Sequence, residues 1–208
     1  MSDSVVRTVP GTTPYAWPYD GVLDPRRTAL LVVLAGAAGA DDGDSVPDPA
    51  LGRIGELAGT VLAAGGAVVE VTTAPPAGGR RGDLPLLRRA STTGLKAPSH
   101  RVTSGGIDGF FASPLDATLR ALGCDQLLLA GQWLETGVHS TMRSANDRGY
   151  ECLLVLDACI AHDPGLVPAA RSQIEMSGGI FGAVGETASV LTAISGTTAI
   201  TGSERTPA

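Results

Sequence analysis

The stretch that decides the fold is GQWLETGVHSTMRSANDRGYECLLVLD, residues Gly131–Asp157. An apolar run over residues 127–130 precedes it and predicts the end of a buried strand, and Gly131 predicts a sharp turn. A helix is expected from about Thr136, followed by a second apolar strand at Cys152–Leu156. In open α/β sheets, a strand, a turn, a helix and a parallel strand form the unit whose strand ends carry ligand sites.

The rest of the chain repeats this alternation of strands and helices. Thr28–Leu34 is a continuous apolar run of strand length, as expected for a strand covered on both faces. A helix is expected from Pro49, because Asp48 can accept from its free N–H groups and proline suits the first helical position. Ala67–Val71 and a short segment at His100–Thr103 predict two more strands. This spacing predicts a parallel sheet with right-handed crossovers.

Three later segments carry helix signals. Ser113–Pro114 predicts a helix start, and Asp116 completes a capping-box pattern. Asp163–Pro164 opens another helix in the same way. Residues 178–194 predict a short strand and a last helix, and the tail after Ser195 is expected to fray.

The chain is expected to form a single domain over residues 24–195, preceded by an arm over 1–23 and followed by a tail over 196–208. The arm has no periodicity and contains three prolines, which is typical of a disordered tail. Against that, it holds three of the eight aromatic residues, as expected of an arm that packs on its own body or on a neighbour. These are Tyr15, Trp17 and Tyr19.

Composition and motifs exclude several classes of function. A net charge of −6 over 208 residues argues against nucleic acid, which favours a basic face. No apolar run approaches the roughly 20 residues that cross a bilayer and no signal pattern opens the chain, so we expect a cytoplasmic protein that does not bind membranes. Three cysteines fit a reducing compartment. The three histidines lack short metal-ligand spacing, and GxGxxG-like and P-loop patterns are absent, so neither a metal nor another cofactor is expected.

The segment GQWLETGVHSTMRSANDRGYECLLVLDA resembles the nucleophile segment of the isochorismatase-like cysteine hydrolases. The similarity is greatest to the ureide-cleaving amidohydrolases related to biuret hydrolase and ureidoacrylate amidohydrolase, which carry a run similar to Trp17–Asp20 before their first strand. The resemblance covers Thr28–Leu34 and Gly109–Ile194 best. It implies a three-layer α/β/α sandwich with a mostly parallel sheet of about six strands, and a cis peptide bond between Gln132 and Trp133.

The family's reaction depends on three groups that this sequence lacks at the matching positions. In the family, a cysteine thiolate attacks an amide or ureide carbonyl, an aspartate handles its proton, and a lysine balances the charge. The position of the cysteine, fixed by ETGVHST, is Gly137; that of the aspartate is Leu34; and that of the lysine, by its spacing from Phe110, is Ser104. The resemblance therefore implies that the Asp-Lys-Cys triad is lost.

Other residues offer partial replacements for the missing groups. Candidate acid–base residues are Glu135, Asp108 and His100, whereas none of the three cysteines has a visible paired base. An indole at Trp133 either forms one wall of a ligand pocket or fills the volume that glycine leaves. The resemblance implies a pocket lined by Leu34, Phe110, Gln132, Trp133 and Gly137.

Two hypotheses about function stay open. In the first, the pocket binds a larger small molecule and steers a non-hydrolytic reaction such as a cyclisation, isomerisation or elimination. In the second, the chain is a catalytically inactive pseudoenzyme that acts as a binding or partner subunit. Residual amide or ureide hydrolysis is a third alternative. An enclosed apolar cavity lined by Leu34, Phe110 and Trp133 would favour the first hypothesis, and a filled site the second. The resemblance also implies a dimer or higher oligomer, with the N-terminal arm as the exchanged segment.

Overall fold

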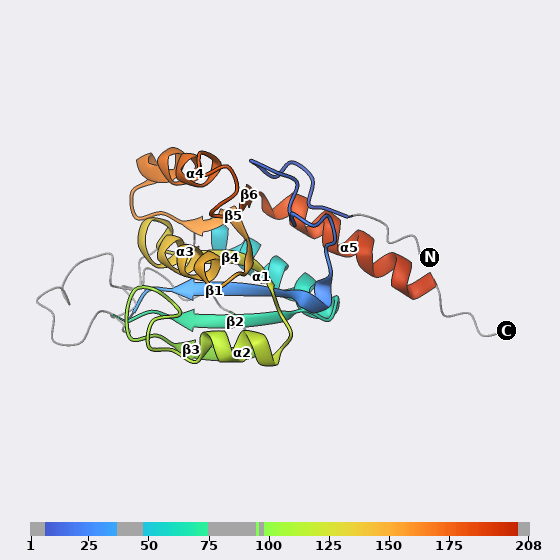
Figure 1. Ribbon diagram of the computed structural model, residues 1–208, viewed down its shortest axis with the longest axis horizontal. Helices are drawn as coiled ribbons and strands as arrows, with labels where there is room; N and C mark the ends of the chain where they lie inside the picture. The colour runs from blue at the N-terminus through green and yellow to red at the C-terminus, as the bar shows by residue number, and fades with distance from the viewer. Residues whose placement is uncertain (1–6, 37–47, 75–94, 96–97, 204–208) are drawn as a thin grey trace, which may run out of the picture.

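A computed structural model describes residues 7–36, 48–74, 95 and 98–203, which form a three-layer α/β/α sandwich (Figure 1). Within these residues one sheet has the strand order β3-β2-β1-β4-β5-β6, and every pair of neighbouring strands is parallel. The strands are β1 Thr28–Leu34, β2 Ala67–Thr72, β3 His100–Thr103, β4 Gln126–Gln132, β5 Glu151–Ile160 and β6 Ala183–Gly185. The fold expected from the resemblance is confirmed.

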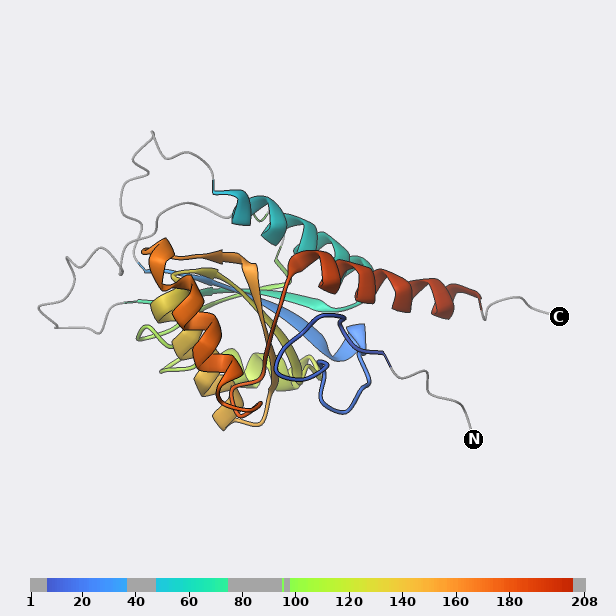
Figure 2. The same cartoon turned by 90° about the horizontal axis from the view of Figure 1, so that it is seen from above.

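The helices cover both faces of the sheet (Figure 2). On one face lie α1 Pro49–Ala63 and α5 Thr187–Ser203, and on the other lie α2 Leu115–Ala121, α3 His139–Asp147 and α4 Val167–Glu175. Short helical turns connect some of these elements: η1 Pro25–Arg27, η3 Leu134–Val138 and η4 Pro164–Leu166.

The side chains of β1 divide the core into two clusters. All seven residues of this strand are buried, and alternate side chains point to opposite faces of the sheet. Leu31 and Val33 pack in the cluster that includes side chains of α2, α3 and α4. Leu30, Val32 and Leu34 pack in the cluster that includes side chains of α1 and α5. The continuous apolar run of the sequence is therefore explained by burial on both faces.

All three predicted capping side chains accept a backbone N–H bond, that of Ser113 from Leu115 at 3.0 Å. Asp48 and Asp163 each accept a hydrogen bond from the backbone N–H two residues later, at 2.8 Å. The capping box predicted at Asp116 is wrong, because its carboxylate instead accepts from Arg120 at 3.0 Å and from the hydroxyl of Tyr150 at 2.9 Å. Arg120 and Tyr150 therefore bind the carboxylate that the capping box would have used.

Several elements begin or end at residues other than those predicted. Gly131 lies inside β4, which continues to Gln132, and α3 begins at His139 after the turn η3. Asp157 does not end β5, because the strand continues to Ile160. Helix α5 continues through Ser203, beyond the predicted end of the domain.

The N-terminal arm packs on its own chain. Trp17 is fully buried, and Thr13 pairs with Val184 of β6 through N–H···O bonds of 3.0 and 2.7 Å. The hydroxyl of Tyr15 donates to Glu151 at 2.7 Å. For residues 7–23 the disordered-tail alternative is therefore wrong, and burial of Trp17 requires no neighbouring molecule.

Candidate functional site

The topology of the sheet singles out one place for a ligand site. Strand β1 lies between β2 and β4, so the order of the strands reverses between β1 and β4. In open α/β sheets, ligands bind beyond the carboxyl ends of the strands at such a switch point. Leu34 ends β1, Gln132 ends β4, and Gly137 lies in the turn η3 that follows. Topology and sequence therefore indicate the same place.

Glycine at position 131 permits a close approach of β4 to β1. Its φ is +119°, and a β-carbon there would lie 2.0 Å from the carbonyl oxygen of Val33. The register between β4 and β5 shifts between Leu129 and Gly131, and the peptide bond Gln132–Trp133 is cis, as the resemblance implied. The backbone then enters η3, which carries Gly137.

Outside the backbone of its own helical segment, the atoms nearest to a β-carbon at Gly137 are apolar or electron-rich. A β-carbon there would lie 3.3 Å from Cγ1 of Val33, 3.6 Å from the carbonyl oxygen of Gln132 and 3.7 Å from that of Ile107. A methyl group and two carbonyl oxygens donate no hydrogen bond. Because carbonyl oxygens carry partial negative charge, they would disfavour a thiolate at this position.

The positions equivalent to the family's aspartate and lysine hold neutral side chains with their own partners. Leu34 is buried and packs toward α1, on the face of β1 opposite to Val33. Ser104 is also buried, and its hydroxyl donates to the carbonyl oxygen of Gly106 at 2.6 Å. Neither side chain supplies a carboxylate or a fixed cation.

Phe110 makes its ring contacts near the C-terminal end of α3. Its ring centroid lies 5.8 Å from that of Tyr150, and the guanidinium of Arg148 lies 4.8 Å from its centre. Arg148 directly follows α3, whereas Gly137 precedes this helix. Phe110 therefore contacts the end of α3 that is opposite to Gly137.

Trp133 packs on the other side of the switch point. It is 8% exposed and shares a small cluster with Ala35, Ala50 of α1 and Ile160 of β5. The edge of its ring meets His162, with 5.3 Å between ring centroids. None of the three atoms nearest to the missing β-carbon of Gly137 belongs to Trp133, so its contacts do not favour the filler alternative.

The three candidate acid–base residues are not brought together. The carboxylate of Glu135 accepts from the backbone N–H groups of His162 at 3.1 Å and Asp163 at 2.8 Å, which ties η3 to η4. Asp108 accepts from the N–H of Phe110 at 2.9 Å. His100 is exposed at the start of β3, away from the carboxyl ends of the strands.

The cysteines do not offer a replacement nucleophile. Burial raises the pKa of Cys124, Cys152 and Cys159, so each thiol stays protonated at neutral pH. Next to the switch point, burial also lowers the pKa of His139, whose Nε2 lies 3.3 Å from the carbonyl oxygen of Ala170. This imidazole, with its backbone contact to α4, is a packed core residue.

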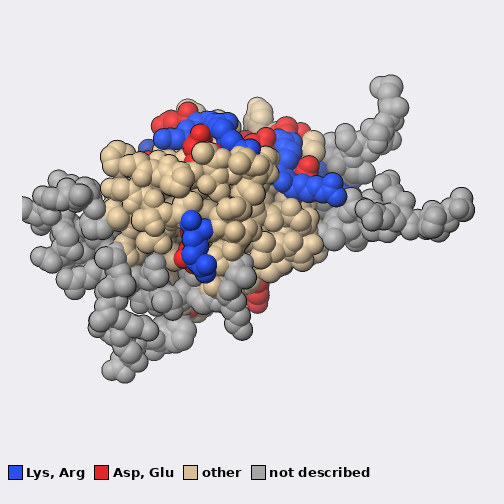
Figure 3. All heavy atoms as spheres, turned by 90° about the horizontal axis from the view of Figure 1, so that it is seen from below, with Lys and Arg blue, Asp and Glu red and all other residues tan. Residues whose placement is uncertain are grey.

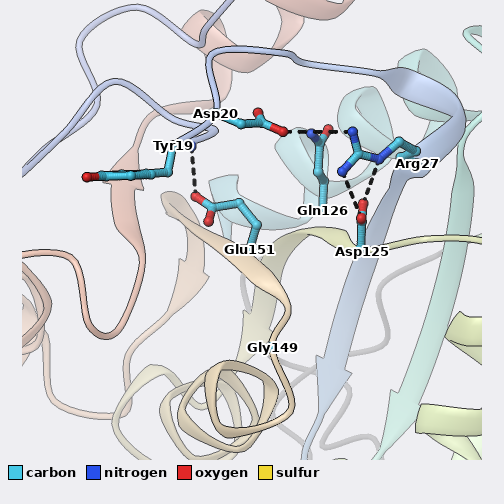
Figure 4. Close-up of a pocket in the computed structure, with 7 residues that line it drawn as sticks. All are labelled: Tyr19, Asp20, Arg27, Asp125, Gln126, Gly149 and Glu151. Carbon is cyan, nitrogen blue, oxygen red and sulfur yellow. Dashed lines mark hydrogen bonds and ion pairs between the residues drawn. The ribbon is translucent and has the colours of Figure 1, made fainter.

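A hollow of about 250 Å³ lies at the opposite edge of the sheet, where β4 and β5 begin (Figure 4). Arg27 donates two bonds to Asp125, at 2.9 and 2.7 Å, and lies 3.8 Å from Asp20. Glu151 accepts from the backbone N–H of Tyr19 at 3.1 Å. Sequence reasoning missed this hollow, because single charged residues before strands have no distinctive pattern. Its charged groups bind one another, and nothing in it requires a ligand.

The described residues were also compared with the requirements of metal binding, membrane insertion and a single-sign charged surface. There, no group of three or more His, Cys, Asp and Glu is placed to hold a metal ion. Among the same residues no helix has the length and apolarity to cross a membrane. On the face shown in Figure 3, acidic and basic side chains lie beside one another within a largely uncharged surface.

The sequence of residues 90–189 matches the Isochorismatase domain. This match covers slightly less than half of the chain and shows a similarity of that part to the domain. An uncharacterised isochorismatase family protein of Bacillus subtilis, YwoC, is 33% identical over 88 residues, which is 41% of this chain and 47% of that protein. The chain thus spans about half the length of this curated relative.

Solved structures with the isochorismatase fold cover most of the chain. An isochorismatase family protein of Burkholderia thailandensis has a TM-score of 0.66 at 25% identity, covering 84% of this chain and 98% of that one. A cysteine hydrolase of Pseudomonas syringae has a TM-score of 0.66 at 21% identity, with 84% and 95% covered. A nicotinamidase of Staphylococcus aureus has a TM-score of 0.55 at 21% identity, with 76% and 99% covered. At these identities, the last two show the fold alone.

Proposed function

We propose that this chain is an isochorismatase-like pseudoenzyme that binds a small molecule at the switch point and does not hydrolyse it through a covalent intermediate. The surroundings of Gly137 support this proposal most directly. The position that the resemblance assigns to the nucleophile has no side chain, and the atoms nearest to it are a methyl group of Val33 and two carbonyl oxygens. A thiolate requires a nearby cation, base or hydrogen-bond donor, and none of these three atoms provides one.

The other two positions of the proposed lost triad support the same conclusion. Leu34 cannot transfer a proton, and Ser104 uses its hydroxyl within its own loop. Glu135 and His139 are the ionisable residues nearest in sequence to Gly137. The carboxylate of Glu135 already binds two backbone N–H groups, and Nε2 of His139 lies 3.3 Å from the carbonyl oxygen of Ala170. A general base must instead reach the proton that it removes.

The geometry favours a binding role over a repurposed enzyme. A repurposed pocket was expected to be an enclosed apolar cavity lined by Leu34, Phe110 and Trp133. Phe110, Leu34 and Trp133 instead belong to three different packing clusters, which supports a filled site. A filled site is the arrangement expected of the pseudoenzyme.

Mass spectrometry tests the absence of hydrolysis. The purified protein is incubated with nicotinamide, a ureide and an isochorismate-like vinyl ether, with the Staphylococcus aureus nicotinamidase as the active control for the amide. We expect no product and no acyl adduct on any of the three cysteines. Turnover that follows the amount of protein, or a substrate-derived adduct, would overturn the proposal.

Thermal unfolding tests the binding role separately. A ligand that binds only the folded state raises the unfolding temperature, and the rise grows with the logarithm of the ligand concentration relative to its Kd. We expect at least one compound of an amide, ureide and aromatic acid library to raise it without being converted. The shift should be smaller in Gly137→Leu, which places a side chain at the switch point, and a shift that is equal in this variant would contradict binding there.

A further inference from the structure

The loop between β3 and α2, residues 104–114, reaches the switch point. The carbonyl oxygen of Ile107 in this loop would lie 3.7 Å from a β-carbon at Gly137, and that of Gln132 would lie 3.6 Å from it. Two backbone acceptors, one from the loop and one from the end of β4, therefore border the space that the missing side chain leaves.

The fold does not use the carbonyl oxygen of Ile107. No group of the described residues donates a hydrogen bond to it. By contrast, the carbonyl oxygen of the neighbouring Gly106 accepts from the hydroxyl of Ser104 at 2.6 Å and from the N–H of Ala74 at 3.1 Å. A backbone carbonyl pairs with a donor from the chain, from water or from a ligand, so the oxygen of Ile107 is available to a ligand.

Hydrogen bonds hold the loop in one shape. The N–H of Gly105 donates to the carbonyl oxygen of Phe111 at 2.9 Å, which closes the loop on itself. The N–H of Gly109 donates to the hydroxyl of Thr141 in α3 at 2.9 Å, which ties the loop to the body of the fold. A loop that is fixed before a ligand arrives loses little conformational entropy on binding.

Phe111 presents an aromatic ring from the same loop. It is 60% exposed, and its ring lies on the backbone of Gly106, because a β-carbon there would lie 3.0 Å from Cδ1 of Phe111. Gly106 directly precedes Ile107 in the chain. Since consecutive Cα atoms are only about 3.8 Å apart, one small molecule can reach both the ring and the carbonyl oxygen of Ile107.

The groups around this place suit a positively charged ligand. A carbonyl oxygen and the face of an aromatic ring both carry partial negative charge, so both attract cations. Asp108, the residue after Ile107, adds a carboxylate to the loop, and this carboxylate accepts from the N–H of Phe110 at 2.9 Å. The position that the resemblance assigns to a lysine holds the neutral Ser104, so that source of repulsion is absent.

We propose that the ligand of the switch point is a planar aromatic cation, such as an aryl amidinium. One of its N–H groups donates to the carbonyl oxygen of Ile107, and its ring packs on Phe111. This inference rests on the proposed function: it gives the chemical class of the ligand and makes Phe111 a residue that determines specificity.

Titration calorimetry of the full-length protein at neutral pH tests the class of ligand. The probes are benzamidine, benzamide and benzoate, which have nearly equal size and shape but are positive, neutral and negative. We expect benzamidine to bind about tenfold more tightly than benzamide, and benzoate to show no measurable binding. Binding of benzamide or benzoate that is as tight as that of benzamidine overturns the inference, and so does the absence of benzamidine binding.

Two variants test the place of binding. Phe111→Leu keeps an apolar side chain but removes the aromatic face, so the Kd of benzamidine should rise roughly 2- to 30-fold. Tyr19→Leu is the matched control, because Tyr19 is 79% exposed and lines the hollow at the opposite edge of the sheet, and the Kd should stay unchanged there. A Kd that rises in Tyr19→Leu and not in Phe111→Leu would place the cation in that hollow and overturn the inference.

The same titrations separate this inference from the proposed function. If benzamide or benzoate binds, if Gly137→Leu weakens that binding, and if benzamidine does not bind, the binding role at the switch point stands and the inference fails. Conversion of benzamide to benzoate, followed by chromatography of the titrated samples, would contradict the proposed function. The order of the three Kd values would then still decide the inference.

Discussion

A β-carbon at Gly137 would contact Val33 at 3.3 Å, a distance that the methyl group can relieve by a small shift. Position 137 therefore tolerates a small side chain sterically, and what it lacks is electrostatic support for a nucleophile. Two carbonyl oxygens lie beside position 137, and Leu34 and Ser104 are neutral. A nucleophile there would therefore lack stabilising charge, although it would have enough space. The distinction can be tested with a single substitution.

Gly137→Cys should fold and remain inert. Its thiol would enter a buried setting beside Val33 and two carbonyl oxygens, and both burial and these dipoles raise a thiol pKa. The positive end of the following helix offsets this by only about 0.3–1 kcal/mol, which is less than one pKa unit of about 1.4 kcal/mol. Iodoacetamide rates measured against pH should give a midpoint above about 8.5. The wild type provides the background from the three native cysteines, and a midpoint below about 7 would show an unrecognised activating group.

Gly131→Ala should destabilise the protein far more than Gly123→Ala. Both glycines have positive φ, so each alanine costs about 1–2 kcal/mol through backbone conformation alone. At Gly131 the new β-carbon would also lie 2.0 Å from the carbonyl oxygen of Val33, whereas at Gly123 it meets nothing within 4 Å. Urea unfolding should show a loss above about 4 kcal/mol at position 131. Equal losses in the two variants would mean that β4 moves away from β1 easily.

Among the elements, the strands with the simplest patterns were predicted best. The bounds of β1 and β3 agree with the prediction, because an apolar run and a short β-rich segment were each limited by polar or flexible neighbours. The prediction ended β5 before Asp157 because this residue is charged. The strand continues through it, since Arg53 and Thr187 bind its carboxylate. Such partners lie far away in sequence and leave no local pattern.

The sequence predicted where the candidate site lies in the chain, but not the directions in which its side chains point. The residues of ETGVHST and the end of β1 were predicted to form the site, and in the sheet both lie at the switch point. The directions of the side chains were not predictable, because Leu34 and Val33 differ only in which face of β1 they occupy. Likewise, the ring contact of Phe110 with Tyr150 joins residues 40 positions apart and leaves no local pattern.

Glu135→Ala should lower stability rather than remove a catalytic acid. Its carboxylate accepts two backbone N–H bonds that hold η4 beside η3, and loss of such bonds costs about 1–3 kcal/mol. Glu56→Ala, on the exposed side of α1, is the matched control and should change little. The measurement is the free energy of unfolding in urea. An unchanged value in Glu135→Ala would leave this carboxylate available for another role.

At the scale of the whole molecule, the arm stabilises the fold on which it lies. Trp17→Ala should cost about 3–5 kcal/mol, as expected for a fully buried large aromatic side chain. Trp17→Phe is the control and should cost less, because the indole N–H has no hydrogen-bond partner among the described residues. Urea unfolding measures both, and similar losses would show that the indole nitrogen matters.

Light scattering tests the oligomer that the resemblance implies. We expect at least a dimer for the full-length chain. Because residues 7–23 pack on their own chain, deletion of residues 1–22 should lower the unfolding temperature and leave the oligomeric mass unchanged. A monomer at full length would contradict the oligomer, and a fall in mass after deletion would show that the arm also contacts a neighbour.

Tyr15 makes the arm sensitive to alkaline pH. Burial raises the pKa of Tyr15, and so does its hydrogen bond to Glu151, so the folded chain retains this proton above the ordinary tyrosine value of about 10. Stability should therefore fall as pH rises above about 10. Tyr15→Phe should flatten this loss, measured as unfolding free energy from pH 9 to 11, while Tyr19→Phe, with an exposed side chain, should not.

The pairing of Thr13 with Val184 has a further consequence for behaviour in solution. Strand β6 is the last strand of the sheet, and an open last strand offers its backbone as a template to other chains. By occupying that edge with two backbone hydrogen bonds, the arm blocks strand-to-strand aggregation there. At protein concentrations well above those used for light scattering, the truncated protein should become turbid and form fibrils. A proline at position 184 should suppress both.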